Sequence, residues 1–192
     1  MLVIGAEKLS SIVDWSDRNT CVLFGDGAGA AVLQNRPNAH GLLTACMGAD
    51  GSKGGLLYMP GGGSRVPATA DSVNARLHYL RMEGRETFKN AVNAMYTAAR
   101  ESLRRCNLEI GQIKCVIPHQ ANQRIIESVG ERLGAQPDQL FVNLHKYGNT
   151  SAASVAIALD EAVTTGRVQR GALILLMVFG AGLTWAAAVI EW

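Results

Sequence analysis

The sequence predicts an α/β protein in which helices cover a largely buried sheet. Short apolar runs bounded by glycine or proline alternate with helical stretches through the second half of the chain. Hydrophobic residues make up 48% and charged residues 18%, which supplies a core and excludes a disordered chain. Aromatic residues are only 6% while there are 21 glycines, so small and aliphatic side chains should fill the core between tight turns. A chain of 192 residues is one domain or part of a larger one.

The first part of the chain predicts three strands. Residues 2–4 and 21–24 are short apolar runs, each stopped by glycine, and are expected to be buried strands. Residues 25–30 (GDGAGA) follow the second run, and we expect a tight bend between two strands there. Residues 30–33 resume the extended pattern and should end before Arg36-Pro37.

A long loop and a long helix come next. Residues 47–75 are rich in Gly, Pro, Ser and Asp, and a loop of that length inside a domain is usually functional or lid-like. From Glu83 to about Cys106 the pattern is helical. The apolar positions form one stripe with three-and-four spacing: Phe88, Val92, Met95, Ala99 and Leu103.

Strands and helices then alternate. Residues 115–117 form a strand closed by Pro118. An amphipathic helix follows and ends at Gly134, with Ile125, Ile126, Val129 and Leu133 on its apolar side. Phe141-Val142 predicts a short extended piece. A buried, alanine-rich helix should run from Asn149-Thr150-Ser151 to Gly166.

The stretch from Gly171 to Ile190 carries no charge and is long enough to cross a bilayer as a helix. Gly180 and Gly182 divide it into two strand-length halves with β-branched or aromatic members, so we expect a buried β-hairpin instead. No other part of the sequence suggests a membrane protein, and no signal peptide is apparent at Met1.

Charge and cysteine content narrow the function further. The formal net charge is +2 and no dense basic cluster is present, which argues against nucleic-acid binding. The cysteines are Cys21, Cys46, Cys106 and Cys115. They show no CxxC spacing, so we expect reduced thiols in a cytoplasmic protein without a disulfide framework or a metal site.

Three polar segments carry candidate chemistry. His119 follows a predicted buried strand, where α/β proteins place their sites, although a single histidine is more often structural. Asn149 is either the N-cap of the following helix or a functional amide. Gly180 and Gly182 form either a plain hairpin turn or a loop that presents backbone N–H groups to an oxyanion. The glycines of residues 25–30 do not fit a dinucleotide fingerprint, because no helix can follow them before Pro37.

Taken together, these segments resemble the β-ketoacyl-[acyl carrier protein] synthase III family of thiolase-fold condensing enzymes. The matching segments are GDGAGAAVL (25–33), IPHQAN (117–122), GNTSAAS (148–154), LDEA (159–162) and FGAGLTW (179–185). The resemblance implies a layered α/β/α thiolase-like fold. Residues 1–46 would be the last strands of the amino-terminal half, and residues 47–192 the carboxy-terminal half.

The resemblance also implies roles for individual residues. His119 and Asn149 would donate hydrogen bonds to the thioester oxygen of malonyl-acyl carrier protein as CO₂ leaves. Asn122 would lie near the pantetheine arm. Phe179 would lie beside the nucleophile, followed by the Gly180 and Gly182 loop.

The implied partners are acyl-CoA and acyl carrier protein, both thioester substrates, together with a second copy of the chain in a homodimer. No other cofactor is implied. Arg124 would meet the acidic carrier protein, with Lys89 and Arg132 as weaker candidates.

One departure from the family is large. The family's nucleophile is a cysteine at the start of a buried helix, and no such segment is present. Cys21 and Cys46 lie in extended apolar runs, Cys106 closes a surface helix and Cys115 lies inside a strand, where thiols are inert. We therefore expect a carboxy-terminal portion of an acyltransferase that primes fatty acid synthesis, inactive alone. Two alternatives remain open: a condensing enzyme of secondary metabolism that makes a quinolone or polyketide, and a non-catalytic carrier-protein-binding remnant.

Overall fold

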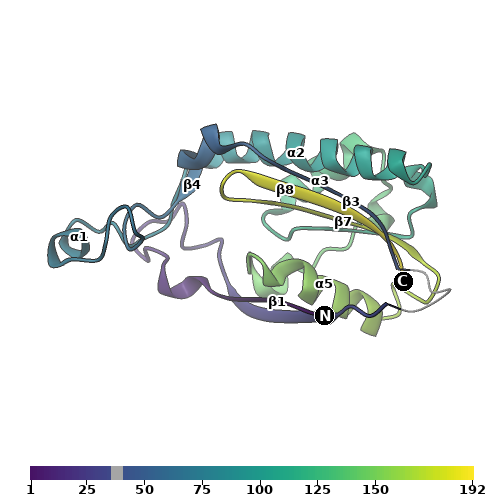
Figure 1. Cartoon of the computed structure of the whole chain (residues 1–192), viewed down its shortest axis with the longest axis horizontal. Helices are drawn as coiled ribbons and strands as arrows, with labels where there is room; N and C mark the ends of the chain where they lie inside the picture. Colours follow the sequence, from purple (N-terminus) through teal and green to yellow (C-terminus); the bar gives the residue numbers. More distant parts are fainter. Residues whose placement is uncertain (36–40) are drawn as a thin grey trace.

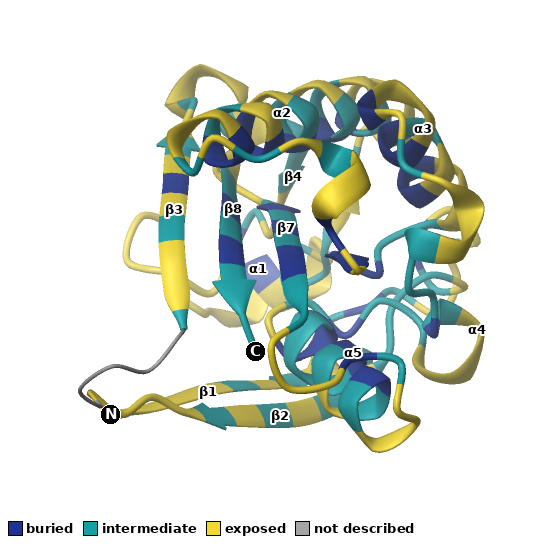
Figure 2. Ribbon diagram, turned by 90° about the vertical axis from the view of Figure 1, so that its right-hand side faces the viewer, coloured by how far each residue is buried: buried dark blue, intermediate teal, exposed yellow. Residues whose placement is uncertain are grey.

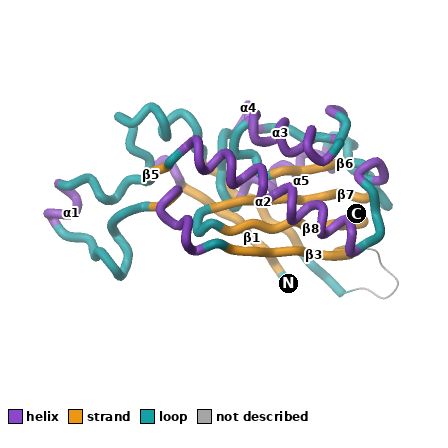
Figure 3. Tube along the Cα trace, turned by 90° about the horizontal axis from the view of Figure 1, so that it is seen from above, coloured by secondary structure: helices purple, strands orange, loops and turns teal. Residues whose placement is uncertain are grey.

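A mixed sheet forms the middle of the molecule in the computed structural model, which describes residues 1–35 and 41–192. Among these residues the sheet has four strands in the order β3-β8-β7-β6. The strands are β3 (Leu42–Ala49), β6 (Cys115–Pro118), β7 (Leu173–Gly180) and β8 (Thr184–Glu191). β6 and β7 are parallel and the other neighbours are antiparallel. Figure 3 shows the four strands side by side beneath a long helix.

Two helices cover one face of this sheet (Figure 1). They are α2 (Gly84–Arg105) and α3 (Gln123–Leu133), and both confirm helices expected from periodicity. Met95, Leu103 and Val129 project from them into a core shared with β7 and β8. Gly134 ends α3 in the left-handed conformation, as glycine permits.

The other face is covered by α5 (Ala153–Thr164), the expected alanine-rich helix. Its Ala158 and Ala162 are fully buried against Cys115, Ile117 and Ile174 of the sheet. Beyond α5 lies a two-stranded ribbon of β1 (Leu2–Lys8) and β2 (Asp26–Val32). The chain is therefore layered as helices, sheet, helix and ribbon, in agreement with the predicted α/β class (Figure 1).

The β7–β8 hairpin confirms the prediction for residues 171–190, with Phe179 opposite Trp185. No helix in the described part of the chain combines the length and the apolar character needed to cross a membrane.

The predicted strand at residues 21–24 is wrong. These residues form a turn whose one extended contact is an isolated bridge from Phe24 to Asn149. The expected glycine bend is also wrong, because Gly27 and Gly29 lie inside β2. Their missing side chains leave room for α5: a Cβ on Gly29 would lie 2.6 Å from Cβ of Ala156. β2 ends at Val32, before Arg36-Pro37 as predicted, and those two residues lie outside the described ones.

Two further expectations need correction. Residues 2–4 form a strand but are not buried: Ile4, for example, is 62% exposed. Within the described residues nothing covers the outer side of the ribbon (Figure 2). Phe141-Val142 is not a strand, although Phe141 N–H donates to the carbonyl of Val116 at 2.9 Å.

The predicted loop at 47–75 is shorter and more ordered than expected. Residues 47–49 belong to β3, since they pair with β8. The rest contains short elements: the 3-10 turn Gly51–Leu56, β4 (Leu57–Tyr58) and α1 (Ala70–Asn74), with β5 (Arg81–Met82) pairing to β4. The remaining short elements, outside this loop, are the 3-10 turns Leu9–Ser11, Ile110–Gln112 and Pro137–Gln139, and α4 (Leu144–Tyr147).

The topology brings polar segments to one edge of the sheet. Because β6 and β7 are parallel, their carboxyl ends lie together, with Pro118 paired to Met177. His119 therefore lies beside the end of β7. The start of α5 lies at the same edge, because the Ser154 hydroxyl accepts a hydrogen bond from the N–H of Gln120 at 2.8 Å.

Candidate active site

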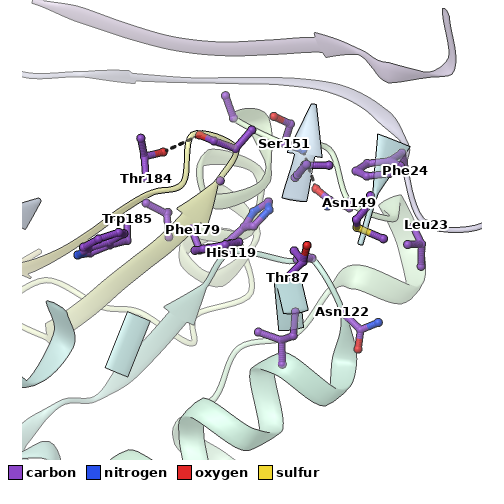
Figure 4. Close-up of a pocket in the computed structure, with 18 of the residues that line it drawn as sticks. Leu23, Phe24, Thr87, His119, Asn122, Asn149, Ser151, Phe179, Thr184 and Trp185 are labelled. Atoms are coloured by element: carbon purple, nitrogen blue, oxygen red, sulfur yellow. Dashed lines mark hydrogen bonds between the residues drawn. The ribbon is translucent and has the colours of Figure 1, made fainter. Parts of the chain in front are cut away.

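A cavity of about 950 Å³ opens at this edge (Figure 4). The end of β6, the loop before α5 and the β7–β8 turn form its polar wall. The start of α2 and residues near β4 and β5 form its apolar wall. Lining residues from these segments include His119, Asn122, Asn149, Phe179, Gly180, Thr87, Phe88, Tyr58 and Met82.

His119 is held at both its backbone and its ring. Its N–H donates to the carbonyl of Met177 at 2.8 Å, which continues the pairing of β6 with β7. Its ring Nδ1 lies 3.0 Å from the hydroxyl oxygen of Ser154 on α5. Burial lowers the pKa of His119 to about 4, because the charged imidazolium would be desolvated. The ring is therefore neutral at pH 7.

Asn149 is fixed by the turn at residues 23–25. Its N–H donates to Leu23 and its carbonyl accepts from Gly25, both at 2.9 Å. A Cβ on Gly25 would lie 2.0 Å from the carbonyl oxygen of Tyr147, so glycine permits this close approach. The Oδ1 atom accepts a hydrogen bond from the N–H of Ser151 at 2.9 Å. The Nδ2 group of Asn149 has no hydrogen-bond acceptor among the described residues. This side chain lines the cavity.

Asn149 is not the N-cap of α5. The capping position is Ala152, and Asn149 instead closes a turn three residues earlier. The capping alternative left open by the sequence is thus excluded. The true asparagine cap is Asn122, whose Oδ1 accepts from the N–H of Arg124 at 2.9 Å at the start of α3.

Only part of the β7–β8 turn lines the cavity. Phe179, Gly180 and Ala181 line the cavity, whereas Gly182 is not among its lining residues. Leu183, in the same turn, exchanges two backbone hydrogen bonds with Asp50. The turn is thereby tied to the end of β3.

The three basic candidates lie outside the cavity and differ in their contacts. Within the described residues the exposed Arg124 side chain makes no ion pair or hydrogen bond. Lys89 lies 3.7 Å from a carboxylate oxygen of Glu86. Arg132 stacks on the ring of Tyr96, with 4.1 Å from the guanidinium carbon to the ring centroid. Of the three, Arg124 is the one without a side-chain partner in the described part of the chain.

Two family models match the chain. The model described as 3-oxoacyl-[acyl-carrier-protein] synthase III C terminal matches residues 103–192. The model described as 3-oxoacyl-[acyl-carrier-protein] synthase III matches residues 1–51. The chain belongs to this family.

Individual relatives named synthase III match this chain over its whole length. It is 57% identical over 192 residues to β-ketoacyl-[acyl-carrier-protein] synthase III of Caldanaerobacter subterraneus subsp. tengcongensis, covering 100% of the chain and 58% of the relative. The crystal structure of the Aquifex aeolicus VF5 synthase III superposes with a TM-score of 0.88 at 47% identity, covering 100% of this chain and 57% of that one. The priming β-ketosynthase of the R1128 polyketide pathway gives 0.86 at 37% identity, with 98% and 56% covered.

The thiolase-like fold expected from the resemblance is confirmed by these superpositions. The chain spans slightly less than three fifths of the curated relatives it matches, and it corresponds to their carboxy-terminal portion.

Among the described residues no cysteine lines the cavity. Cys46 and Cys115 are buried. Burial raises the pKa of the Cys115 thiol, although Arg167 partly offsets the effect. A thiol in that state is a poor nucleophile.

Two groups of site residues were not singled out from the sequence. Ser154 was noted only as part of a matching segment, and no local pattern shows that its hydroxyl meets His119. The apolar wall includes Tyr58 from the predicted loop at 47–75, and Leu80 and Met82 from the segment that follows it. The length and composition of that loop were the available signal.

Proposed function

We propose that this chain supplies the decarboxylation site of a β-ketoacyl-acyl carrier protein synthase III, which joins an acyl-CoA primer to malonyl-acyl carrier protein at the start of fatty acid synthesis. The observation that carries the proposal is that His119 and Asn149, brought from different elements, line one cavity. Membership of the synthase III family makes a thioester the substrate to consider first.

In the proposed reaction, the bond between the malonyl carboxylate carbon and the α-carbon breaks and CO₂ leaves. The electron pair stays on the thioester as an enolate. Its oxygen accepts hydrogen bonds from His119 and from Asn149 Nδ2. Preorganised donors in a poorly hydrated site stabilise such developing charge, and each contributes about 10²–10³ in rate. A His119 pKa of about 4 keeps the donor neutral across physiological pH.

The enolate carbon then attacks an acyl thioester carried on a cysteine, a carbon–carbon bond forms and the thiolate leaves. Phe179 and the backbone of Gly180 and Ala181 lie where this acyl group would be held, with Gly182 in the outer part of the same turn. Asn122 would contact the pantetheine arm. In this proposal the cysteine comes from a separate segment, because the four thiols of this chain do not line the cavity.

The test compares the chain alone with a joined protein and with two variants of the joined protein. The purified 192-residue chain should give no β-ketoacyl product from acyl-CoA and malonyl-acyl carrier protein. Joining it to the part of the Caldanaerobacter relative that it does not cover should supply the cysteine and restore condensation. His119→Ala or Asn149→Ala in the joined protein should each reduce malonyl decarboxylation at least about 100-fold. Condensation by the chain alone, or full decarboxylation by both variants, would refute the proposal.

A second candidate function has specific support. The priming β-ketosynthase of a polyketide pathway superposes almost as well as the synthase III of Aquifex aeolicus. The decarboxylation chemistry would be unchanged and only the primer or product would differ. A profile of acyl-CoA primers with the joined protein separates the two functions. Binding of malonyl-acyl carrier protein without any decarboxylation would instead indicate a non-catalytic remnant.

A further inference from the structure

The two nitrogens of the His119 ring face different surroundings. Nδ1 lies 3.0 Å from the hydroxyl oxygen of Ser154, which is 2% exposed. No hydrogen bond involves Nε2 within the described residues. Every fully buried side-chain nitrogen and oxygen in this part of the chain has a partner, so Nε2 must lie at the surface of the cavity that His119 lines.

The Ser154 hydroxyl has a second partner that fixes its direction. The backbone N–H of Gln120 donates to the same oxygen at 2.8 Å. A backbone N–H can only donate, so this bond occupies one lone pair of the hydroxyl. The Gln120 side chain is itself anchored, since its Nε2 donates to the carbonyls of Pro118 and Phe141 at 2.8 and 3.1 Å. The backbone N–H of Gln120 is therefore held in place against the Ser154 oxygen.

The hydroxyl proton then decides the state of the ring. If Nδ1 were protonated, it and Gln120 N–H would both donate to the Ser154 oxygen, and the hydroxyl proton would have no acceptor among the described residues. Buried donors without acceptors are strongly disfavoured. If the hydroxyl donates to Nδ1, all three groups are satisfied. A neutral imidazole that accepts at Nδ1 carries its proton at Nε2.

We propose that Ser154 is a positioning residue that holds neutral His119 in the tautomer with its proton on Nε2, so that an N–H donor faces the cavity. The use of that donor in decarboxylation rests on the proposed function, whereas the tautomer does not. Burial of the ring supports the neutral state. The serine on α5 thus sets the chemistry of a side chain at the end of β6.

Two-bond ¹⁵N–¹H correlation spectra of the full chain, labelled in its histidine rings, test the proposal at pH 7. The His119 signals are assigned by their loss in His119→Gln. The wild type should show protonated Nε2 and unprotonated Nδ1. Ser154→Ala should shift the pattern towards a mixture of tautomers, and Ser154→Thr, which keeps the hydroxyl, should restore it.

Ser102→Ala is the matched control, because Ser102 is another fully buried serine but bonds to the carbonyl of Ala187. It should leave the His119 signals unchanged. Protonated Nδ1 in the wild type would overturn the proposal without any variant, and so would an unchanged pattern in Ser154→Ala.

Decarboxylation by the joined protein separates this inference from the proposed function. Ser154→Ala should slow decarboxylation about 10- to 100-fold, as loss of a group that orients a functional histidine does. If the wild type shows the predicted tautomer but does not decarboxylate, the proposed function is rejected and the tautomer assignment stands.

Discussion

His119 combines a buried position with a titratable ring, and this has a consequence for stability. Burial lowers its pKa to about 4, from an ordinary value of 6.5. Between these two values the unfolded chain binds the proton more tightly than the folded chain does. The contribution of this residue to the free energy of unfolding is therefore present above pH 6.5 and is lost as the pH falls towards 4.

His119→Gln should remove this dependence. Urea unfolding gives the free energy of unfolding at pH 7 and at pH 4. Between these pH values the wild type should lose up to about 3 kcal/mol more than the variant loses. The difference between the two proteins at each pH is the informative quantity, because the other titrating groups are common to both. Parallel stability curves for the two proteins would contradict a neutral buried imidazole.

Arg124 offers the clearest test of carrier-protein docking at the residue scale. Its exposed guanidinium has no ion pair in the described part of the chain, whereas Lys89 and Arg132 have partners. Arg124→Gln should weaken binding of malonyl-acyl carrier protein about fivefold at low salt, equivalent to about 1 kcal/mol, and less at high salt.

Fluorescence anisotropy of labelled carrier protein measures this effect. Arg104→Gln is the control, because it removes the same charge from the last turn of α2, whereas the first turns of α2 line the cavity together with the start of α3. Equal losses in the two variants would show a general charge effect instead of a docking site.

At the scale of elements, the contact between α5 and the β1–β2 ribbon depends on missing side chains. A Cβ on Gly29 would lie 2.6 Å from Cβ of Ala156 and 3.1 Å from the backbone nitrogen of Ile157. Since the helix backbone would have to move, Gly29→Ala should destabilise the protein by about 1–3 kcal/mol. Gly111→Ala is the matched control: its Cβ meets no atom within 4 Å. Thermal unfolding that affects both variants equally would argue against this packing.

Gln120 joins two loops that frame the site. Besides its two donated bonds, its Oε1 accepts from the N–H groups of Asn143 and Leu144 at 2.9 and 3.2 Å. Gln120→Leu keeps the bulk but leaves these backbone groups unpaired in a buried place, so unfolding in urea should show a loss of about 3 kcal/mol or more. Gln123→Leu, at an exposed position on α3, should change stability little. A near-neutral Gln120→Leu would mean that water replaces the amide.

The whole molecule exposes apolar side chains on the β1–β2 ribbon and on the edge strand β3. In the ribbon, Leu2, Ile4 and Val32 are 58%, 62% and 77% exposed, and in β3 Met47 is 85% exposed. Large exposed apolar patches and open strand edges favour association. We expect the isolated chain to self-associate, and we propose that a homodimer with further family segments covers this surface in the active assembly.

Light scattering after size-exclusion chromatography tests the expectation. Ile4→Lys should reduce the associated fraction, since it places a charge in the patch without disturbing the core. Val73→Lys, on the protruding α1 segment and also exposed, should leave it unchanged. A monodisperse monomer at tens of micromolar wild-type protein would contradict the idea.

The α/β class, the helices at residues 84–105 and 123–133, the β7–β8 hairpin and the family could all be predicted from the sequence. Periodicity and glycine or proline boundaries are local signals, and long ordered motifs are specific to one family. Only the tertiary structure decided that residues 21–24 form a turn clamping Asn149, that the glycines of β2 admit α5, and that Ser154 reaches His119. Those contacts join residues that are distant along the chain, and local composition does not encode which distant groups will meet.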